Sequence, residues 1–239
     1  MFTTRVDEIA AGIYRISTAV PPDPRMPPGF TFNQFLIVDD EPLLFHTGMR
    51  KLFPQIRDAV ARVIPIARLR WVSYSHHESD EDGSLLEWMQ AAPQAAPLCG
   101  HINAICGADD TTDRTPRVVA DGETIVLGKK RVQWLATPHV PHGWDAGMLF
   151  EHTTRTLFCA DLFTQAGSDH APTTEHDIVG PSEQMRAAMD YYSNPTSAAA
   201  TIDRLAACEP VLLAAMHGSA YRGNGAAALR SLATSLRGE

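Results

Sequence analysis

The stretch SHHESDEDGS, residues 75–84, places two histidines and four carboxylates within ten positions. The apolar segment LRWVSYS before it predicts a buried strand, and GSLLEWMQAA after it predicts a helix that begins at a serine. Neighbouring carboxylates repel one another, and a divalent cation bound by imidazole and carboxylate groups offsets that repulsion. The stretch therefore predicts a metal site. A solvated charged loop is the alternative, and it accounts best for Asp82.

Three further segments each place a potential ligand at the end of a predicted strand. TPHVPHGWD (137–145) offers His139 and His142, LFCADLF (157–163) offers Asp161, and LLAAMHGSAYRG (212–223) offers His217. One histidine in such a place is more often a hydrogen-bonded structural residue. Four such positions along one chain favour a single metal centre built from distant segments.

The composition limits the classes of function. With 239 residues, 44% of them hydrophobic, the chain has enough apolar material for one compact domain, 1–239. The net charge of −8, without a basic block, argues against nucleic-acid or anionic-membrane partners. No apolar run of membrane-spanning length and no signal peptide are evident, so we expect a cytoplasmic protein. The four cysteines lack metal-binding spacing and are expected to be reduced thiols.

The order of predicted elements indicates two similar halves. Strands are expected at 12–18, 31–38 and 41–48, and the proline-rich residues 20–30 form a stiff loop. A helix follows from Phe53, then the strand and acidic stretch described above. Residues 117–161 repeat the β-rich pattern, and helices are expected at 182–192, 196–208 and from about Ala226. This order predicts an α+β fold in which two sheets pack face to face, with helices on both outer faces.

Taken together, these motifs resemble a known superfamily. The order His76-x-Glu78-x-Asp80, then His142 before a Trp-Asp pair, an Asp after a strand and a His-Gly pair resembles the metallo-β-lactamase superfamily. Most of its hydrolases have a histidine where Glu78 stands. With a glutamate at this position, the sequence resembles the diiron domain of flavodiiron proteins and stand-alone oxygen-binding diiron proteins. Other segments resemble the same branch, namely FNQFLIVDDEPLLFHTG, TPHVPHGWDAGMLF, MDYYSNP and MHGSAYR. The resemblance implies an αββα four-layer sandwich with metals at one edge.

The resemblance also implies a set of ligands and cofactors. Carried over position by position, it assigns His76, Glu78 and His142 to one iron, Asp80, Glu81 and His217 to the other, and Asp161 as the bridge. Such an oxygen-rich donor set suits iron or manganese better than zinc, although zinc stays open. No bound flavin is expected, because we find no flavodoxin domain or phosphate-binding loop in the sequence.

The sequence departs from the family pattern at two positions. Glu81 stands where the family has a second histidine, so it either ligates the second metal or faces away and leaves an open position. His46, in the segment FHTG, stands where relatives have an aspartate, which indicates altered support for the ligands.

Two other histidines are weighed as residues near the site. His142 is preferred to His139 as the ligand because only His142 stands three residues before Asp145, as in the family pattern. His170 is considered as a pocket residue, and His139 as a neighbour of the ligands.

Three functions are compatible with these observations. The first is a non-haem diiron protein that binds dioxygen or nitric oxide, with or without reducing it, and that uses an external electron donor. The second is a binuclear metal-dependent hydrolase of a small ester, lactone or thioester. The third is a metal-poor or single-metal protein without turnover. Whether the chain is an oxidoreductase or a hydrolase, and whether it forms a homodimer, stays open at this point.

Overall fold

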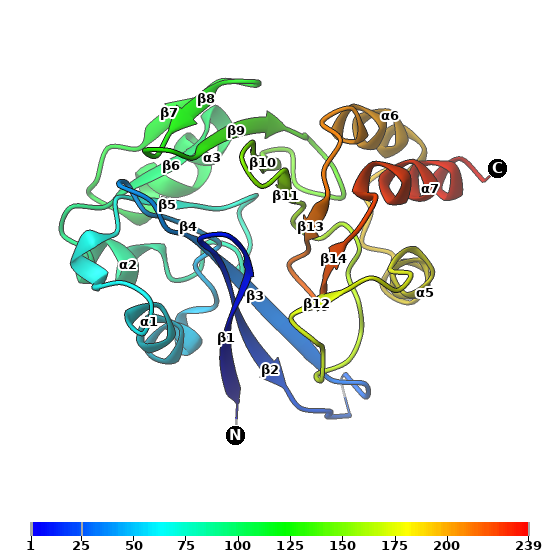
Figure 1. Ribbon diagram of the computed structural model, residues 1–239, viewed down its shortest axis with the longest axis horizontal. Helices are drawn as coiled ribbons and strands as arrows, with labels where there is room; N and C mark the ends of the chain where they lie inside the picture. Colours follow the sequence, from blue (N-terminus) through cyan, green and yellow to red (C-terminus); the bar gives the residue numbers. More distant parts are fainter. Residues whose placement is uncertain (1, 25, 239) are drawn as a thin grey trace.

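Two seven-stranded sheets pack face to face and carry helices on their outer faces (Figure 1). The computed structural model describes residues 2–24 and 26–238. The strands of the first sheet are β1 (Thr3–Ala10), β2 (Ile13–Val20), β3 (Phe30–Ile37), β4 (Leu43–Phe45), β5 (Trp71–Ser73), β6 (Ala96–Gly100) and β7 (Arg117–Val119). The strands of the second sheet are β8 (Thr124–Val126), β9 (Arg131–Ala136), β10 (Gly147–Glu151), β11 (Thr156–Phe158), β12 (Thr173–Thr174), β13 (Leu212–Ala214) and β14 (Ala220–Arg222).

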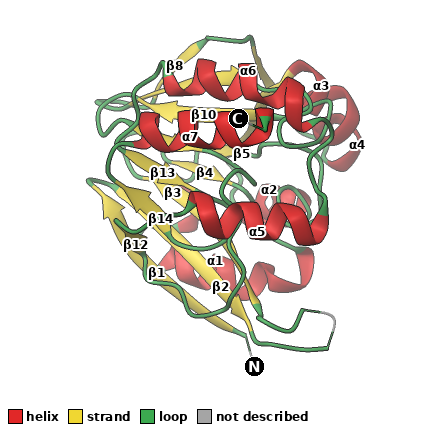
Figure 2. Cartoon of the chain, turned by 90° about the vertical axis from the view of Figure 1, so that its right-hand side faces the viewer, coloured by secondary structure: helices red, strands yellow, loops and turns green. Residues whose placement is uncertain are grey.

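The helices divide between the two outer faces. They are α1 (Phe53–Ala61), α2 (Leu85–Ala91), α3 (His101–Asn103), α4 (Asp109–Thr111), α5 (Val179–Met189), α6 (Pro195–Ala206) and α7 (Gly225–Arg237). The short α3 and α4 are joined by a π-helical turn, Ala104–Ala108. Helices α1 and α2 cover the first sheet, whereas α5, α6 and α7 lie over the second, as the side view shows (Figure 2). No helix in the described residues is long and apolar enough to cross a membrane.

Strand order separates the two halves of the chain. The first sheet runs β1 to β7 in chain order, antiparallel as far as β4 and parallel beyond it. The second sheet has the order β12-β14-β13-β11-β10-β9-β8. Each half of the chain therefore forms one sheet with its own helices. The predicted four-layer αββα sandwich is confirmed.

Three apolar layers hold the four structural layers together. The layer between the sheets contains Phe35, Trp134 and Phe158. The layer under α1 and α2 includes Trp88, and the layer under α6 and α7 includes Leu229. These side chains are almost fully buried, and each such burial stabilises the fold by about 1.5–3 kcal/mol.

The structure differs from the sequence predictions in a few elements. Strand β1 was not predicted, because Arg5, Asp7 and Glu8 hide its weak apolar alternation, and the short β12 and β14 were also missed. The β-rich pattern of residues 117–161 divides between the sheets, because β7 ends the first sheet and β8 begins the second. Ser84 occupies the N-terminal position of α2, but its hydroxyl donates to the Gly48 carbonyl and does not cap the helix.

The potential metal ligands all lie in loops that follow strands. The acidic stretch follows β5, His142 lies between β9 and β10, Asp161 follows β11, and His217 lies between β13 and β14. Strands from both sheets thus deliver polar side chains to one edge of the sandwich. The rigid sheets fix the loop ends, which keeps the side chains close together.

Candidate metal centre

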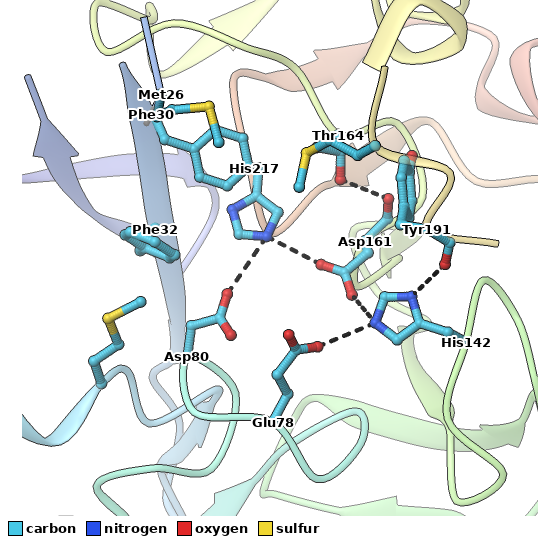
Figure 3. Close-up of a pocket in the computed structure, with 12 residues that line it drawn as sticks. Met26, Phe30, Phe32, Glu78, Asp80, His142, Asp161, Thr164, Tyr191 and His217 are labelled. Atoms are coloured by element: carbon cyan, nitrogen blue, oxygen red, sulfur yellow. Dashed lines mark hydrogen bonds and ion pairs between the residues drawn. The ribbon is translucent and has the colours of Figure 1, made fainter. Parts of the chain in front are cut away.

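Four of the predicted ligands form one compact group. Donor atoms of His76, Glu78, His142 and Asp161 all lie within 4.8 Å of one another. His76 Nε2 is 3.0 Å from both Glu78 Oε2 and His142 Nε2. His142 Nε2 is 3.4 Å from Asp161 Oδ2 (Figure 3). Two imidazole nitrogens and two carboxylates that converge in this way are a donor set for a divalent metal. We call this group subsite one.

A second group adjoins it on the other side of Asp161. His217 Nε2 lies 3.1 Å from Asp161 Oδ1 and 3.5 Å from Asp80 Oδ2. Asp161 therefore presents Oδ2 to His142 and Oδ1 to His217, as Figure 3 shows. One carboxylate that faces two groups of donors is the arrangement by which two metals share a bridge. We call His217 and Asp80, with the shared Asp161, subsite two.

The imidazole rings are oriented for metal binding by their outer nitrogens. His142 Nδ1 lies 2.8 Å from the Tyr191 carbonyl, and His217 Nδ1 lies 2.8 Å from the Thr31 carbonyl. A carbonyl only accepts, so each Nδ1 donates, and each Nε2 is left to bind a metal once it has lost its own proton. His76 Nδ1 likewise contacts the Ser75 hydroxyl at 2.9 Å. The rings of His142 and His217 thus fit a metal ion in both tautomer and direction.

The negative charge of the site raises the pKa values of its histidines. Burial alone would lower the pKa of His76, but its hydrogen bond with Glu78 and the nearby carboxylates raise it to about 10. Burial would also lower the pKa of His217, but Asp161 and Asp80 outweigh that effect and raise the pKa to about 9. Hydrogen bonding to Glu78 also raises the pKa of His142 against the effect of its burial. Without a cation, protons neutralise part of the cluster.

The carboxylates shift in different directions. Hydrogen bonds from His142 and His76 lower the pKa of Glu78 to about 2. Burial would raise the pKa of Asp161, but the three surrounding histidines hold it far below its usual range. Burial raises the pKa of Asp80 to about 7, with only His217 opposing. Strongly perturbed groups that share one cavity are characteristic of functional sites.

The space above the ligands is lined on one side by apolar groups. The cavity has a volume of about 290 Å³, and its apolar wall consists of Met26, Phe30, Phe32, Met49 and Met189. The ring of Phe30 stacks on His217 with centroids 4.2 Å apart. A small cavity that is polar at its base and apolar above suits a small, uncharged molecule.

Sequence reasoning missed most of this wall and the carbonyls that orient the rings. The α5 helix was expected to continue to Tyr192, but it ends at Met189 because Asp190 adopts a left-handed conformation, with φ of 51°. Tyr191 therefore leaves the helix and offers its carbonyl to His142. The only sequence signal for this role was the segment MDYYSNP. Met26 lies in the predicted stiff loop, and nothing in the sequence indicated that it lines the cavity.

Other predicted histidines lie outside the centre. His139 is exposed and does not line the cavity, whereas His142, from the same loop, does. His170 lines a different cavity, together with Arg15. His77 is turned outward, and its Nδ1 lies 2.6 Å from Asp82 Oδ2. Its backbone N–H donates to Asp145, which ties the acidic stretch to the loop of His142.

Comparison with protein families identifies the chain. A model of the ODP family beta lactamase matches residues 30–218, which is most of the sequence. The chain belongs to the ODP family. All of the residues of both subsites lie within the matched segment. The predicted membership of the metallo-β-lactamase superfamily is therefore confirmed.

Named relatives of this ODP family chain are flavodiiron proteins. It is 27% identical over 169 residues to the anaerobic nitric oxide reductase flavorubredoxin of Salmonella arizonae, covering 70% of this chain and 35% of the relative. It is 25% identical over 170 residues to the rubredoxin-oxygen oxidoreductase of Megalodesulfovibrio gigas, covering 70% of this chain and 42% of the relative. The chain thus spans less than half the length of these relatives.

Solved structures share the fold over nearly the whole ODP family chain. The rubredoxin oxygen:oxidoreductase from Desulfovibrio gigas has a TM-score of 0.83 and 20% identity, covering 97% of this chain and 61% of that one. The flavodiiron protein from Giardia intestinalis has a TM-score of 0.80 and 18% identity, covering 99% and 60%. The four-layer sandwich is the fold of these flavodiiron cores.

Glu81 and His46, the two residues at which this chain departs from the family pattern, contact each other. Glu81 Oε2 lies 2.7 Å from His46 Nε2, and both side chains are completely buried. The two atoms are in close contact, although their alignment is not that of a directed hydrogen bond. The ring of His46 also packs on Phe45, with centroids 4.2 Å apart. The structure therefore places the Glu81 carboxylate against His46 and does not bring it into the group around Asp161.

Proposed function

We propose that the chain binds two iron ions and that this centre binds dioxygen or nitric oxide and reduces it with electrons from a separate donor. The observation that carries the proposal is the placement of Asp161, whose two oxygens face two different groups of donors. The names of the relatives support the choice of gas, since they include a nitric oxide reductase and a rubredoxin-oxygen oxidoreductase.

The ligand assignment that we propose is unequal between the two metals. Subsite one holds its iron through His76, Glu78, His142 and the shared Asp161. Subsite two holds its iron through Asp80, His217 and Asp161, and Glu81 stays paired with His46. Subsite two then has one protein ligand fewer, which leaves more of its coordination positions for small molecules.

Iron is the metal that best fits this donor set and these relatives. Bound ferrous iron would supply electrons and open coordination positions for a diatomic gas. Manganese suits the same oxygen-rich donors, and zinc competes for the imidazoles.

The chain's own residues have three roles in this proposal. The carbonyls of Tyr191 and Thr31 hold the rings of His142 and His217 in the binding tautomer. Thr164 donates from its hydroxyl to the backbone carbonyl of Asp161 at 2.7 Å, which fixes the loop of the bridging residue. The methionine and phenylalanine wall favours an uncharged gas over ions and limits the access of water.

Anaerobic reconstitution with ferrous iron tests the proposal. We expect about two irons per chain and a new absorption band when nitric oxide or air is admitted. The matched control is His139→Asn, because His139 lies in the same loop as His142 but outside the cavity. That variant is expected to keep both the iron and the band.

Preferential zinc uptake without a spectral response to either gas would contradict the proposal. An activated metal-bound water and a polarised carbonyl would then favour the binuclear hydrolase, and esters and lactones would be the substrates to screen. Substoichiometric metal of every kind would favour the protein without turnover.

A further inference from the structure

A buried arginine lies behind the metal centre, and within the described residues no ion pair joins it to a carboxylate. Arg15 belongs to β2 and stands opposite Phe35 of β3, so its side chain points between the two sheets. It is only 1% exposed. One terminal nitrogen, Nη2, donates to the Gly218 carbonyl at 2.8 Å, while Nε has no hydrogen-bond partner. A buried guanidinium with an unused donor requires an acceptor.

The guanidinium lines a second cavity, separate from the gas cavity. Its volume is about 270 Å³, and its polar lining consists of Thr3, Arg5, Arg15, Ser17, Thr31, Ser168, Asp169 and His170. Two arginines, four hydroxyl groups and an imidazole thus face one small space. Residues of the β1–β2 hairpin form one wall, and residues of the loop before β12 form the other.

The nearby carboxylates do not satisfy the arginine. Asp169 is almost fully exposed and pairs with Arg5, at 3.8 Å. Asp7 faces Arg15 across the β1–β2 ladder, and its Oδ2 is likewise buried without a hydrogen-bond partner among the described residues. It does not line the cavity, and within residues 2–24 and 26–238 no ion pair joins it to Arg15. Burial lowers the pKa of Arg15 to about 10 despite the attraction of Asp7.

We propose that this cavity binds a small oxyanion, of which inorganic phosphate and a carboxylate are the two candidate forms. The planar guanidinium pairs with both in a two-pronged geometry, and the hydroxyl groups of Ser17 and Ser168 supply further donors. Arg5 lies at the exposed side of the cavity, where its positive charge attracts an entering anion. Anion binding at this site requires neither bound iron nor the proposed gas chemistry.

The two cavities share one wall. Gly218, which receives the bond from Arg15, follows His217 directly, and its N–H donates to the Thr31 hydroxyl at 2.8 Å. The Thr31 carbonyl in turn orients the His217 ring. An anion that holds Arg15 in place would therefore stiffen the segment that carries a proposed metal ligand.

Calorimetric titration of the metal-free full chain with sodium phosphate tests the site. A chelator removes iron, so phosphate cannot bind to the metal, and sodium chloride at equal ionic strength measures the effect of salt alone. We expect one saturable phosphate site per chain. A parallel titration with acetate distinguishes the forms: tighter phosphate identifies a tetrahedral dianion, and tighter acetate identifies a carboxylate.

Variants locate the binding. Arg5→Ala is expected to weaken the affinity about tenfold, since it removes one charge-assisted interaction without disturbing the core. Asp169→Asn is expected to strengthen it roughly threefold because a competing negative charge is lost. His142→Ala, in the gas cavity, and Arg62→Ala, an exposed residue that directly follows α1, are expected to leave the affinity unchanged.

Three results would overturn the proposal. One is the absence of saturable binding of either anion. Another is an affinity that Arg5→Ala leaves unchanged. The third is binding that disappears in His142→Ala, which would place the anion among the protonated histidines of the metal centre. None of these outcomes depends on whether iron binds or reacts, so failure here is distinct from failure of the proposed function.

Discussion

The two subsites share one carboxylate and differ in what the chain offers on either side of it. In subsite one, every residue of the ligand pattern points inward, and the donor atoms of His76, Glu78, His142 and Asp161 converge. In subsite two, His217 and Asp80 point inward, whereas Glu81 turns to the buried His46. A sequence motif thus specifies which residues are near a metal, and the partners behind them decide which ones face it.

The His46–Glu81 contact explains both departures from the family together. Where the family has an aspartate and a histidine, this chain has a histidine and a glutamate, and the structure brings the two positions into contact. Acid and imidazole have in effect exchanged places. A buried carboxylate without a partner is costly, and His46 gives Glu81 a partner while it holds a potential ligand away from the centre.

The largest effect is expected for the shared residue. Asp161→Asn removes the negative bridge from both subsites, so we expect iron affinity to fall by more than about 100-fold. Loss of a residue that only supports a metal ligand typically weakens affinity by about 10- to 100-fold. Metal analysis after anaerobic reconstitution and gel filtration measures this loss. Retention of two tightly bound irons would contradict the bridging role.

The next largest effect separates the two glutamates. Glu78→Gln removes an inward-facing ligand and is expected to weaken the first iron by at least about tenfold. Glu81→Gln, its matched control in the same stretch, is expected to leave the iron stoichiometry unchanged. Equal losses of iron in the two variants would show that Glu81 is a ligand and would abolish the difference between the subsites.

The buried pair should matter more for stability than for metal binding. His46→Ala leaves the Glu81 carboxylate buried and unpaired, so we expect the free energy of unfolding of the metal-free protein to fall by about 3 kcal/mol. Urea denaturation followed by circular dichroism gives this value. A double variant, His46→Asp with Glu81→His, restores the family's pair and is expected to recover much of the stability and to tighten the second iron. A His46→Ala protein as stable as the parent would exclude the pair as a stabilising contact.

Protons provide a smaller test of the site's charge. The pKa values of His76 and His217 are raised to about 10 and about 9, above the ordinary value of about 6.5. A raised pKa stabilises the folded, metal-free protein fully below about pH 6.5, and this contribution is lost as the pH rises through about 9 to 10. Melting temperatures between pH 6 and 10 are therefore expected to fall for the metal-free protein and to change less for the iron-loaded one.

The same pKa shifts predict proton release on metal binding. Near pH 7.5 His76 and His217 carry protons that a metal must displace. Calorimetry in buffers of different ionisation enthalpy is therefore expected to show about two protons released per chain. Iron binding should tighten as the pH rises. A release of zero protons would mean that the imidazoles do not ligate.

Much of this architecture was predictable from the sequence, for identifiable reasons. Strands such as Phe30–Ile37 carry strong apolar patterns, and ligands at strand ends converge because sheet geometry brings those ends to one edge. The direction in which the Glu81 side chain points was not predictable, since it depends on His46. That residue is 35 positions earlier in the sequence, and α1 lies between the two along the chain. The Arg15 cavity was equally invisible, because β1 was too polar to be predicted and its pairing with β2 creates the wall.

The central claim is that two unlike metal subsites share Asp161, and Mössbauer spectroscopy during an anaerobic titration with ferrous iron tests it most directly. We predict two quadrupole doublets, of which the one from subsite one fills first and the one from subsite two follows at higher iron concentration. The second doublet should be perturbed by His46→Asp with Glu81→His while the first is not. A single doublet that saturates at one iron per chain, or two doublets that fill together and respond equally to that variant, would contradict the account.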